Sequence, residues 1–281
     1  AIYGVADAPY SLALFGSTAT GANGSAAIAG GYANAPNSTA IGSGANTSGA
    51  GTNIAIGSAL SSGEGATAIG HALNFSYNQS EALGNYSLAL AGGRANSNSS
   101  VAIGISGSGR STVSGLYATA IGGGTAVGDN SIAIGESSYA NALQTTAIYG
   151  VADAPYSLAL FGSTSAGATG AVAISGGYAQ APYSTAIGSG ASTTGAGNSV
   201  AIGGGTIAGG EASSAFGANV GTGTHVGAFA IGDRSPNPLT SSFAYNENDA
   251  DNQMMMRFAG GYKLYSNPEA TVGTQLTPGS N

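Results

Sequence analysis

The stretch that decides the fold is Asn130-Ser131-Ile132-Ala133-Ile134-Gly135, which recurs in variant form along most of the chain. Its core is a small or aliphatic residue, an alanine, an aliphatic residue and then usually a glycine. Close copies include Thr39-Ala40-Ile41-Gly42 and Val200-Ala201-Ile202-Gly203, and successive centres stand mostly 12 to 15 residues apart. This period is too short for helical-pair repeats, which need about 33 to 47 residues per unit.

A period of this length predicts a β-solenoid in which each coil contributes two short strands. Successive strand residues point to opposite faces, so we expect isoleucine to fill a narrow interior and alanine to point outward. The glycine then lets the chain turn where φ is positive. Roughly 17 coils spaced about 4.8 Å apart would build a rod of about 80 Å. So thin a coil buries little apolar surface, which predicts that neighbouring chains cover its second face.

The chain also repeats on a longer scale. Ala1 to Thr18 recurs unchanged as Ala147 to Thr164, and residues 1–57 match residues 147–203 at 44 of 57 positions. The chain is therefore a tandem duplication of an array that was already repetitive. We expect three parts: a first β-roll array at 1–146, a second, duplicated array at 147–233, and a C-terminal trimerising tip or pre-chaperone segment at 234–281.

Composition excludes several classes of protein. Glycine supplies 50 of 281 residues and only 6% of residues are charged, so a layered α/β enzyme with a wide core is not expected. The net charge of −7 removes the basic surface that nucleic-acid binding needs and disfavours an anionic membrane. The absence of cysteine excludes disulfides and cysteine-type zinc sites. The chain lacks an apolar run of about 18 residues and begins inside a repeat, which predicts a processed or excised segment without a membrane-spanning helix.

The repeat unit resembles the head repeats of YadA-like trimeric adhesins. The resemblance is carried by Asn198-Ser199-Val200-Ala201-Ile202-Gly203 and by the unit at 130–135, which has Ser137 or Ser138 near its end. It covers roughly residues 1–233. The resemblance implies a left-handed parallel β-roll, with three identical chains side by side at the distal part of a surface fibre. It is specific for the fold and much less specific for any ligand.

The C-terminal segment is similar to the part of phage tail fibres and tailspikes that leads into a self-cleaving intramolecular chaperone domain. The similarity rests on Asn252 to Asn267 and on the ending Leu276 to Asn281. It implies a trimeric fibre on a virion or on a bacterial surface. We interpret the large apolar residues of this segment as a trimer-locking core of short strands, with an exposed binding tip as the alternative: Met254, Met255, Met256, Phe258, Tyr262, Leu264 and Tyr265.

Convergent titratable groups, which catalysis needs, are not evident in the sequence. His71 and His225 stand many coils apart and are interpreted as surface residues, with a metal site on a trimer axis as the minor alternative. Glu64 and Glu81 are the candidates for the paired carboxylates of a polysaccharide-cleaving tailspike. The acidic run from Glu247 to Asp251 lacks the spacing of an EF-hand and is interpreted as a solvated linker. We therefore expect no catalytic residue, no metal and no cofactor.

Surface recognition is the function that remains. The chain has 14 tyrosines and no tryptophan, and an aromatic ring can lie against the C–H face of a sugar. The repeat rhythm breaks between Ile69 and Leu90 and between Ile103 and Ile121, and insertions in a solenoid usually become loops on a binding face. The candidate ligand-binding residues in or beside these breaks are His71, Asn74, Tyr77, Asn78, Tyr86, Arg94, Arg110 and Tyr117. The tyrosines interpreted as structural or turn residues are Tyr10, Tyr32, Tyr156, Tyr178 and Tyr183.

The sequence thus predicts an extracellular, homotrimeric fibre segment that attaches to a cell surface through a glycan or protein receptor. It predicts neither an enzyme, nor a nucleic-acid-binding protein, nor membrane insertion. The alternatives are a purely structural shaft with its receptor site elsewhere and, less favoured, a polysaccharide-cleaving tailspike. Ice binding is disfavoured because threonine does not recur at one fixed repeat position.

Overall fold

The computed structural model describes residues 1–18, 20–70, 79–106, 109–234 and 246–277. Across these residues the chain is all-β and contains no helix. It is a parallel β-solenoid that divides into two compact units, Ala1–Ala159 and Leu160–Asn281. The predicted β-solenoid class is therefore confirmed, whereas the left-handed sense and the trimer stay predictions.

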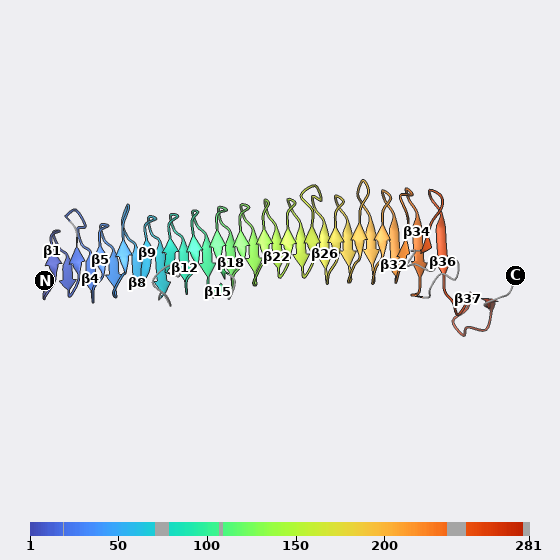
Figure 1. Ribbon diagram of the computed structural model, residues 1–281, viewed down its shortest axis with the longest axis horizontal. Coiled ribbons are helices and arrows are strands. Elements are labelled where there is room, and N and C mark those ends of the chain that lie inside the picture. The colour runs from blue at the N-terminus through green and yellow to red at the C-terminus, as the bar shows by residue number, and fades with distance from the viewer. Residues whose placement is uncertain (19, 71–78, 107–108, 235–245, 278–281) are drawn as a thin grey trace. The chain divides into compact units, whose positions relative to one another are not determined.

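Each coil carries two strands that lie beside their equivalents in the neighbouring coils of the same unit (Figure 1). Sheet A contains the repeat's Ala-Ile core, and sheet B contains the shorter strand that follows. Pairing in sheet A joins like residues, because Ala27 pairs with Ala40 and Ala40 pairs with Ala55. The sequence repeat therefore sets the register.

The strands of the first unit fall into these two sheets and one hairpin. Sheet A contains β2 (Leu12–Leu14), β4 (Ala26–Ile28), β6 (Thr39–Ile41), β8 (Ile54–Gly57), β10 (Thr67–Gly70), β12 (Leu88–Leu90), β14 (Val101–Ile103), β18 (Thr119–Ile121), β20 (Ile132–Ile134) and β22 (Thr146–Ile148). Sheet B contains β1 (Val5–Ala6), β3 (Ser17–Thr18), β5 (Tyr32–Ala33), β7 (Asn46–Thr47), β9 (Ala59–Ser61), β11 (Ser80–Ala82), β13 (Arg94–Ala95), β17 (Thr112–Val113), β19 (Thr125–Ala126), β21 (Tyr139–Ala140) and β23 (Val151–Ala152). The antiparallel hairpin is β15 (Ile105–Ser106) with β16 (Gly109–Arg110).

The second unit has the same arrangement. Its sheet A contains β26 (Val172–Ile174), β28 (Thr185–Ile187), β30 (Val200–Ile202), β32 (Ser214–Gly217), β34 (Phe229–Gly232) and β36 (Met254–Arg257). Its sheet B contains β25 (Ser163–Thr164), β27 (Tyr178–Ala179), β29 (Ser192–Thr193), β31 (Ile207–Ala208), β33 (Val220–Gly221) and β35 (Asn246–Glu247). Strand β24 (Leu158–Leu160) includes residues of both units.

The interior of a coil is built from alanine. Ala27, Ala40 and Ala133 of sheet A have no solvent exposure, and Ala33 of sheet B has none either. Their neighbours on the same strands, such as Ile28, face outward and are only half-buried in the single chain. The prediction that isoleucine points inward and alanine outward is therefore wrong, although the alternation itself is present.

The physical reason is the narrowness of the coil. A Cβ atom added at Gly31 would stand 2.3 Å from the carbonyl oxygen of Ala40, and one added at Gly93 would stand 2.2 Å from that of Ala102. The backbone at one corner thus closes directly on the inward alanine of the next coil. Because so little space is left, a methyl group fits the interior and an isoleucine side chain does not.

Two corners join the sheets in every coil. At the A-to-B corner the chain leaves a sheet A strand, and at the B-to-A corner it returns to the next one. The B-to-A corner carries a residue with positive φ, such as Asn130 at 55°, and the N–H of Asn130 donates to the carbonyl oxygen of Leu116 in the preceding coil at 2.8 Å. Corner hydrogen bonds of this kind continue the ladder between the sheets.

The β15–β16 hairpin leaves the coil at the A-to-B corner, because it follows β14 of sheet A and precedes β17 of sheet B. Residues 71–78 and 235–245, which come after β10 and β34 in the sequence, lie outside the described residues.

The solenoid pairing continues past residue 233, where the sequence predicted the repeat array to end. Strand β35 pairs with β33, and β36 pairs with β34, so that Met254 and Met256 follow Phe229 and Ile231 in register. The methionines therefore belong to a further strand of sheet A. The predicted short strands of this segment are present, and its trimer-locking role stays a prediction. Beyond the methionines, β37 (Tyr262–Tyr265) and β38 (Gly273–Leu276) form an antiparallel hairpin.

Candidate functional site

The predicted ligand-binding residues do not form one site among the described residues. His71, Asn74, Tyr77 and Asn78 lie outside the described residues. The other predicted residues divide between two places: Tyr86 and Tyr117 at the B-to-A corner, and Arg94 and Arg110 near the A-to-B corner.

Arg94 and Arg110 meet at Glu81. Arg94 of β13 pairs in register with Glu81 of β11, and its Nε lies 2.9 Å from Glu81 Oε2. Arg110, at the end of the β15–β16 hairpin, places Nη1 3.5 Å from Glu81 Oε1. It also donates hydrogen bonds to the carbonyl oxygens of Gly92 at 3.1 Å and Gln79 at 2.8 Å. This cluster therefore ties the hairpin to the neighbouring coils.

The proposed carboxylate pair is not formed within the part of the chain that the structure describes. Glu64 lies at the B-to-A corner, where its N–H donates to Asn85 Oδ1 at 3.0 Å. Glu81 lies on sheet B, between two guanidinium groups, and no described contact joins it to Glu64. His225 forms a 3.4 Å contact with Asp251, whose side chain is 61% exposed. In the described ranges, no group of three or more His, Asp or Glu residues could hold a metal ion.

The acidic run takes part in the last coil. Asp251 Oδ1 accepts a hydrogen bond from the N–H of Val226 at 2.9 Å, and Asp249 Oδ1 accepts one from Gln253 Nε2 at 2.6 Å. Glu247 belongs to strand β35. The run is therefore part of the last coil and not a linker, although Glu247, Asp249 and Asp251 are exposed to solvent as the sequence predicted.

Tyr86 and Tyr117 occupy a corner position that other tyrosines share. Their φ angles are 56° and 55°, and Tyr10, Tyr156 and Tyr183 have the same left-handed backbone. The ring of Tyr86 lies over Gly65 of the preceding coil, where an added Cβ would stand 2.8 Å from a ring carbon. The interpretation of Tyr10, Tyr156 and Tyr183 as turn residues is confirmed, and Tyr86 and Tyr117 are turn residues of the same kind.

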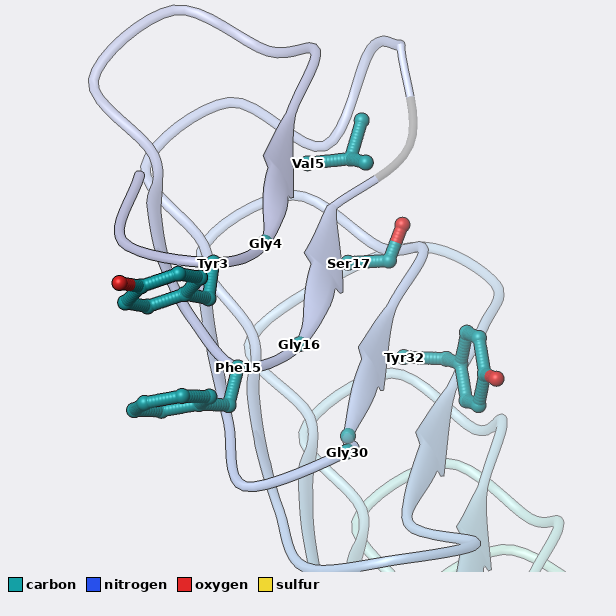
Figure 2. Close-up of a pocket in the computed structure, with 9 residues that line it drawn as sticks. Tyr3, Gly4, Val5, Phe15, Gly16, Ser17, Gly30 and Tyr32 are labelled. Carbon is teal, nitrogen blue, oxygen red and sulfur yellow. The ribbon is translucent and has the colours of Figure 1, made fainter.

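An aromatic hollow lies at the A-to-B corner of the first coils, where the sequence predicted no site (Figure 2). The rings of Tyr3 and Phe15 stack with their centroids 5.5 Å apart and their planes 14° apart. Figure 2 shows these rings on one side, with Val5, Ser17 and Tyr32 on the other. We call this space of about 240 Å³ the Phe15 hollow, and its lining is Tyr3, Gly4, Val5, Phe15, Gly16, Ser17, Gly30, Gly31 and Tyr32.

The backbone explains how the hollow forms. Phe15 has a φ of 53° at the A-to-B corner, where the equivalent residue of another coil is Gly42. A left-handed backbone costs a non-glycine residue about 1–2 kcal/mol. Gly16 keeps the corner close to the next coil, because a Cβ there would stand 2.9 Å from the carbonyl carbon of Ala27. In the next coil the corner residue is Ala29, which carries no ring.

The sequence did contain a signal for this hollow. The repeat's Ile-Gly becomes Ile2-Tyr3-Gly4 and Leu14-Phe15-Gly16, within the stretch that recurs unchanged at 147–164. Tyr32 was interpreted as structural, and the structure places its side chain outward with 54% exposure. Large aromatic residues at a position that otherwise takes small ones are the observation that sequence reasoning missed.

Comparison with known families agrees with this coil geometry. Parts of the chain match the YadA head domain repeat. The matching residues are 126–148, 179–206 and 196–219, so the YadA-like matches fall in both units. They do not include the C-terminal segment, and the phage-fibre similarity stays a prediction. No curated protein matches the chain. In the described part of the chain, no helix is long and apolar enough to cross a membrane.

Proposed function

We propose that this chain is a segment of a homotrimeric, YadA-like adhesin fibre, exposed on a bacterial surface or on a virion tail, which attaches to a target cell through glycans. The observation that carries the proposal is a stripe of aliphatic side chains along the outer face of sheet A, in a chain that matches the YadA head domain repeat.

The stripe follows the last outward position of each sheet A strand. In the first unit it consists of Leu14, Ile28, Ile41, Ile56, Ile69, Leu90, Ile103, Ile121, Ile134 and Ile148. In the second unit the same position holds Ile174, Ile187, Ile202, Ile231 and Met256, with the aromatic Phe216 among them. The aliphatic stripe runs along the strands of both units.

A single chain leaves much of this outer face uncovered. Ile69 of the stripe is 39% exposed, and Ile132 at the neighbouring outward position is also 39% exposed. Fully burying an isoleucine side chain stabilises a protein by about 1.5–3 kcal/mol, and the alanine interior supplies little apolar area per coil. Three chains that pack stripe against stripe would supply the missing burial.

Attachment is the role that a rigid, repetitive trimer serves well. A trimer presents each surface feature three times, so weak individual contacts combine into avid binding. The exposed aromatic side chains at the corners suit saccharides, and the net charge of −7 disfavours anionic partners.

The test is a native mass measurement followed by binding of the labelled oligomer to a glycan array and to intact bacterial cells. We expect a mass three times 26.7 kDa and a coherent set of bound glycans. A correctly assembled trimer that binds neither glycans nor cells would instead support the structural shaft, and a helical monomer would overturn the fibre itself.

A further inference from the structure

We infer that the Phe15 hollow binds a neutral hexopyranose, with the apolar C–H face of the sugar on the face of Phe15 turned away from Tyr3. This inference rests on the proposed attachment function and gives it a site outside the predicted ligand-binding residues. It depends on a rigid, exposed ring, an open glycine floor beside that ring, and an uncharged lining.

Phe15 is an exposed ring on a fixed backbone. Its N–H donates to the carbonyl oxygen of Ile2 at 3.0 Å, and its own carbonyl oxygen accepts the N–H of Gly30 at 2.5 Å. Tyr3 stacks on one face of the ring, and the corner residue beyond the other face is Ala29. Phe15 therefore remains 58% exposed, and a rigid ring face of this kind is a platform for the C–H face of a sugar.

The floor of the hollow is glycine backbone. Ser17 of β3 and Tyr32 of β5 are in register, and in Figure 2 their side chains point away from the rings of Tyr3 and Phe15. Glycines 16, 30 and 31 place no side chain between Phe15 and these two residues, so the hollow is open beside the ring. Because no residue in the lining is charged, the hollow suits a neutral sugar better than an anionic one.

The same local arrangement occurs inside the second unit. Phe161 has a φ of 51° and is 61% exposed. The N–H of Gly176 donates to its carbonyl oxygen at 2.5 Å, as that of Gly30 does to Phe15. Ser163 is in register with Tyr178, and the small residue at the next corner is Ser175. The sequence duplication is therefore matched by a duplicated half of the hollow, Phe161 with Ser163, Gly176 and Tyr178, within one unit.

The position of the hollow favours a small ligand over a second copy of the chain. The aliphatic stripe proposed for trimer packing lies instead on the outer face of sheet A.

The test uses saturation-transfer NMR on the full chain with three probes at millimolar concentration: methyl β-galactoside, methyl β-glucoside and N-acetylglucosamine. We expect transfer to the ring C–H protons of at least one sugar. The variant Phe15→Gly/Phe161→Gly should reduce this transfer by about 3- to 10-fold, because it removes the stacking surface. Glycine already occupies the equivalent corner at Gly42, so the variant should keep its coil.

The matched control is Tyr10→Gly/Tyr156→Gly. It removes exposed tyrosines with the same left-handed backbone from the B-to-A corner, where Gly24 and Gly65 stand in other coils, and it should leave the transfer unchanged. Unchanged transfer in the phenylalanine variant, or no transfer to any probe from the unmodified chain, would overturn the inference. Loss of the trimer mass in the phenylalanine variant would also overturn it, because the rings would then be a subunit contact.

Cell attachment separates this inference from the proposed function. If the phenylalanine variant is trimeric and still attaches to cells as the unmodified chain does, the hollow is not the receptor site while the adhesin fibre stands. If the unmodified trimer does not attach at all, the adhesin function itself fails.

Discussion

At the scale of the residue, the fold depends on side chains smaller than those of most cores. The inward alanines are fully buried, and glycine is required where one corner meets the next coil. Gly177 is such a position, because a Cβ there would stand 2.2 Å from the carbonyl oxygen of Ala186. A clash with backbone cannot be relieved by a rotamer change, so the coil itself would have to move.

We therefore predict that Gly177→Ala destabilises the chain by roughly 1–3 kcal/mol, the usual cost of overpacking. The matched control is Gly204→Ala, since an added Cβ at Gly204 meets nothing within 4 Å. The control should be neutral or stabilising by about 0.4–1 kcal/mol, because alanine restricts the unfolded chain. Thermal unfolding followed by circular dichroism would compare them, and equal losses of stability would contradict the close approach at Gly177.

The residue scale also explains the error in the predicted orientation. Alternation along a strand is visible in the sequence, but its phase is not, because Ala and Ile are both apolar. The sequence indicated which residues share a face and left open which face is inside. The distance between the corner backbone and the next alanine decides that question.

At the scale of the element, the β15–β16 hairpin is positioned by charge as well as by its own pairing. The Arg110 side chain is 20% exposed and that of Glu81 is 16% exposed, and Arg110 also donates to the backbone of the two preceding coils. Hydrogen bonds to charged groups contribute about 1.5–3 kcal/mol when partly buried. This cluster therefore holds the hairpin against sheet B.

We predict that Arg110→Gln speeds amide hydrogen exchange in residues 104–111 by roughly 10- to 100-fold, since the hairpin loses its charged hydrogen bonds. Exchange in β20 should not change, because that strand lies outside the cluster. Arg94→Gln is the control: its side chain is 45% exposed, so its ion pair with Glu81 contributes less. Hydrogen-exchange mass spectrometry would compare residues 104–111 and β20 in the unmodified chain and in both variants. No acceleration in the Arg110 variant would show that the hairpin is held by its backbone alone.

The two rhythm breaks differ in what the structure describes. The break between Ile103 and Ile121 contains the β15–β16 hairpin, as an interrupted repeat predicts, whereas residues 71–78 of the other break lie outside the described residues. The sequence did not indicate that Arg94 and Arg110 converge on Glu81, since that convergence depends on which strands lie side by side. The sequence also could not distinguish a turn residue from a binding residue at Tyr86, because the residue type of a single tyrosine does not indicate a positive φ.

At the scale of the whole molecule, the question is what covers the outer face of sheet A. Ala133 and Ile134 are neighbours on β20, yet Ala133 has no exposure and Ile134 faces outward. In the proposed trimer Ile134 packs between chains, whereas Ala133 packs within one coil. A substitution at Ile134 therefore tests packing between chains, and a substitution at Ala133 tests packing within one coil.

We predict that Ile134→Asp prevents trimer formation but leaves a β-rich chain, because a charge buried between subunits costs several kcal/mol. Ala133→Asp should abolish the β-rich fold itself. Ile134→Leu is the control, since Leu14 and Leu90 occupy the same stripe. Native mass spectrometry and circular dichroism distinguish these outcomes, and a normal trimer from Ile134→Asp would show that the stripe is not the subunit interface.

By itself the sequence determined the repeat, its period and the class of fold, because a 12–15-residue rhythm of Ala-Ile-Gly units has few ways to bury its apolar side chains. It also determined where the rhythm breaks. The tertiary structure decided which side chains lie inside, how Glu81 gathers two arginines and where Phe15 is exposed. Those features depend on the spacing between neighbouring coils and on the φ angles at their corners. Neither the spacing between coils nor the φ angles at their corners can be predicted from the order of residues along one strand.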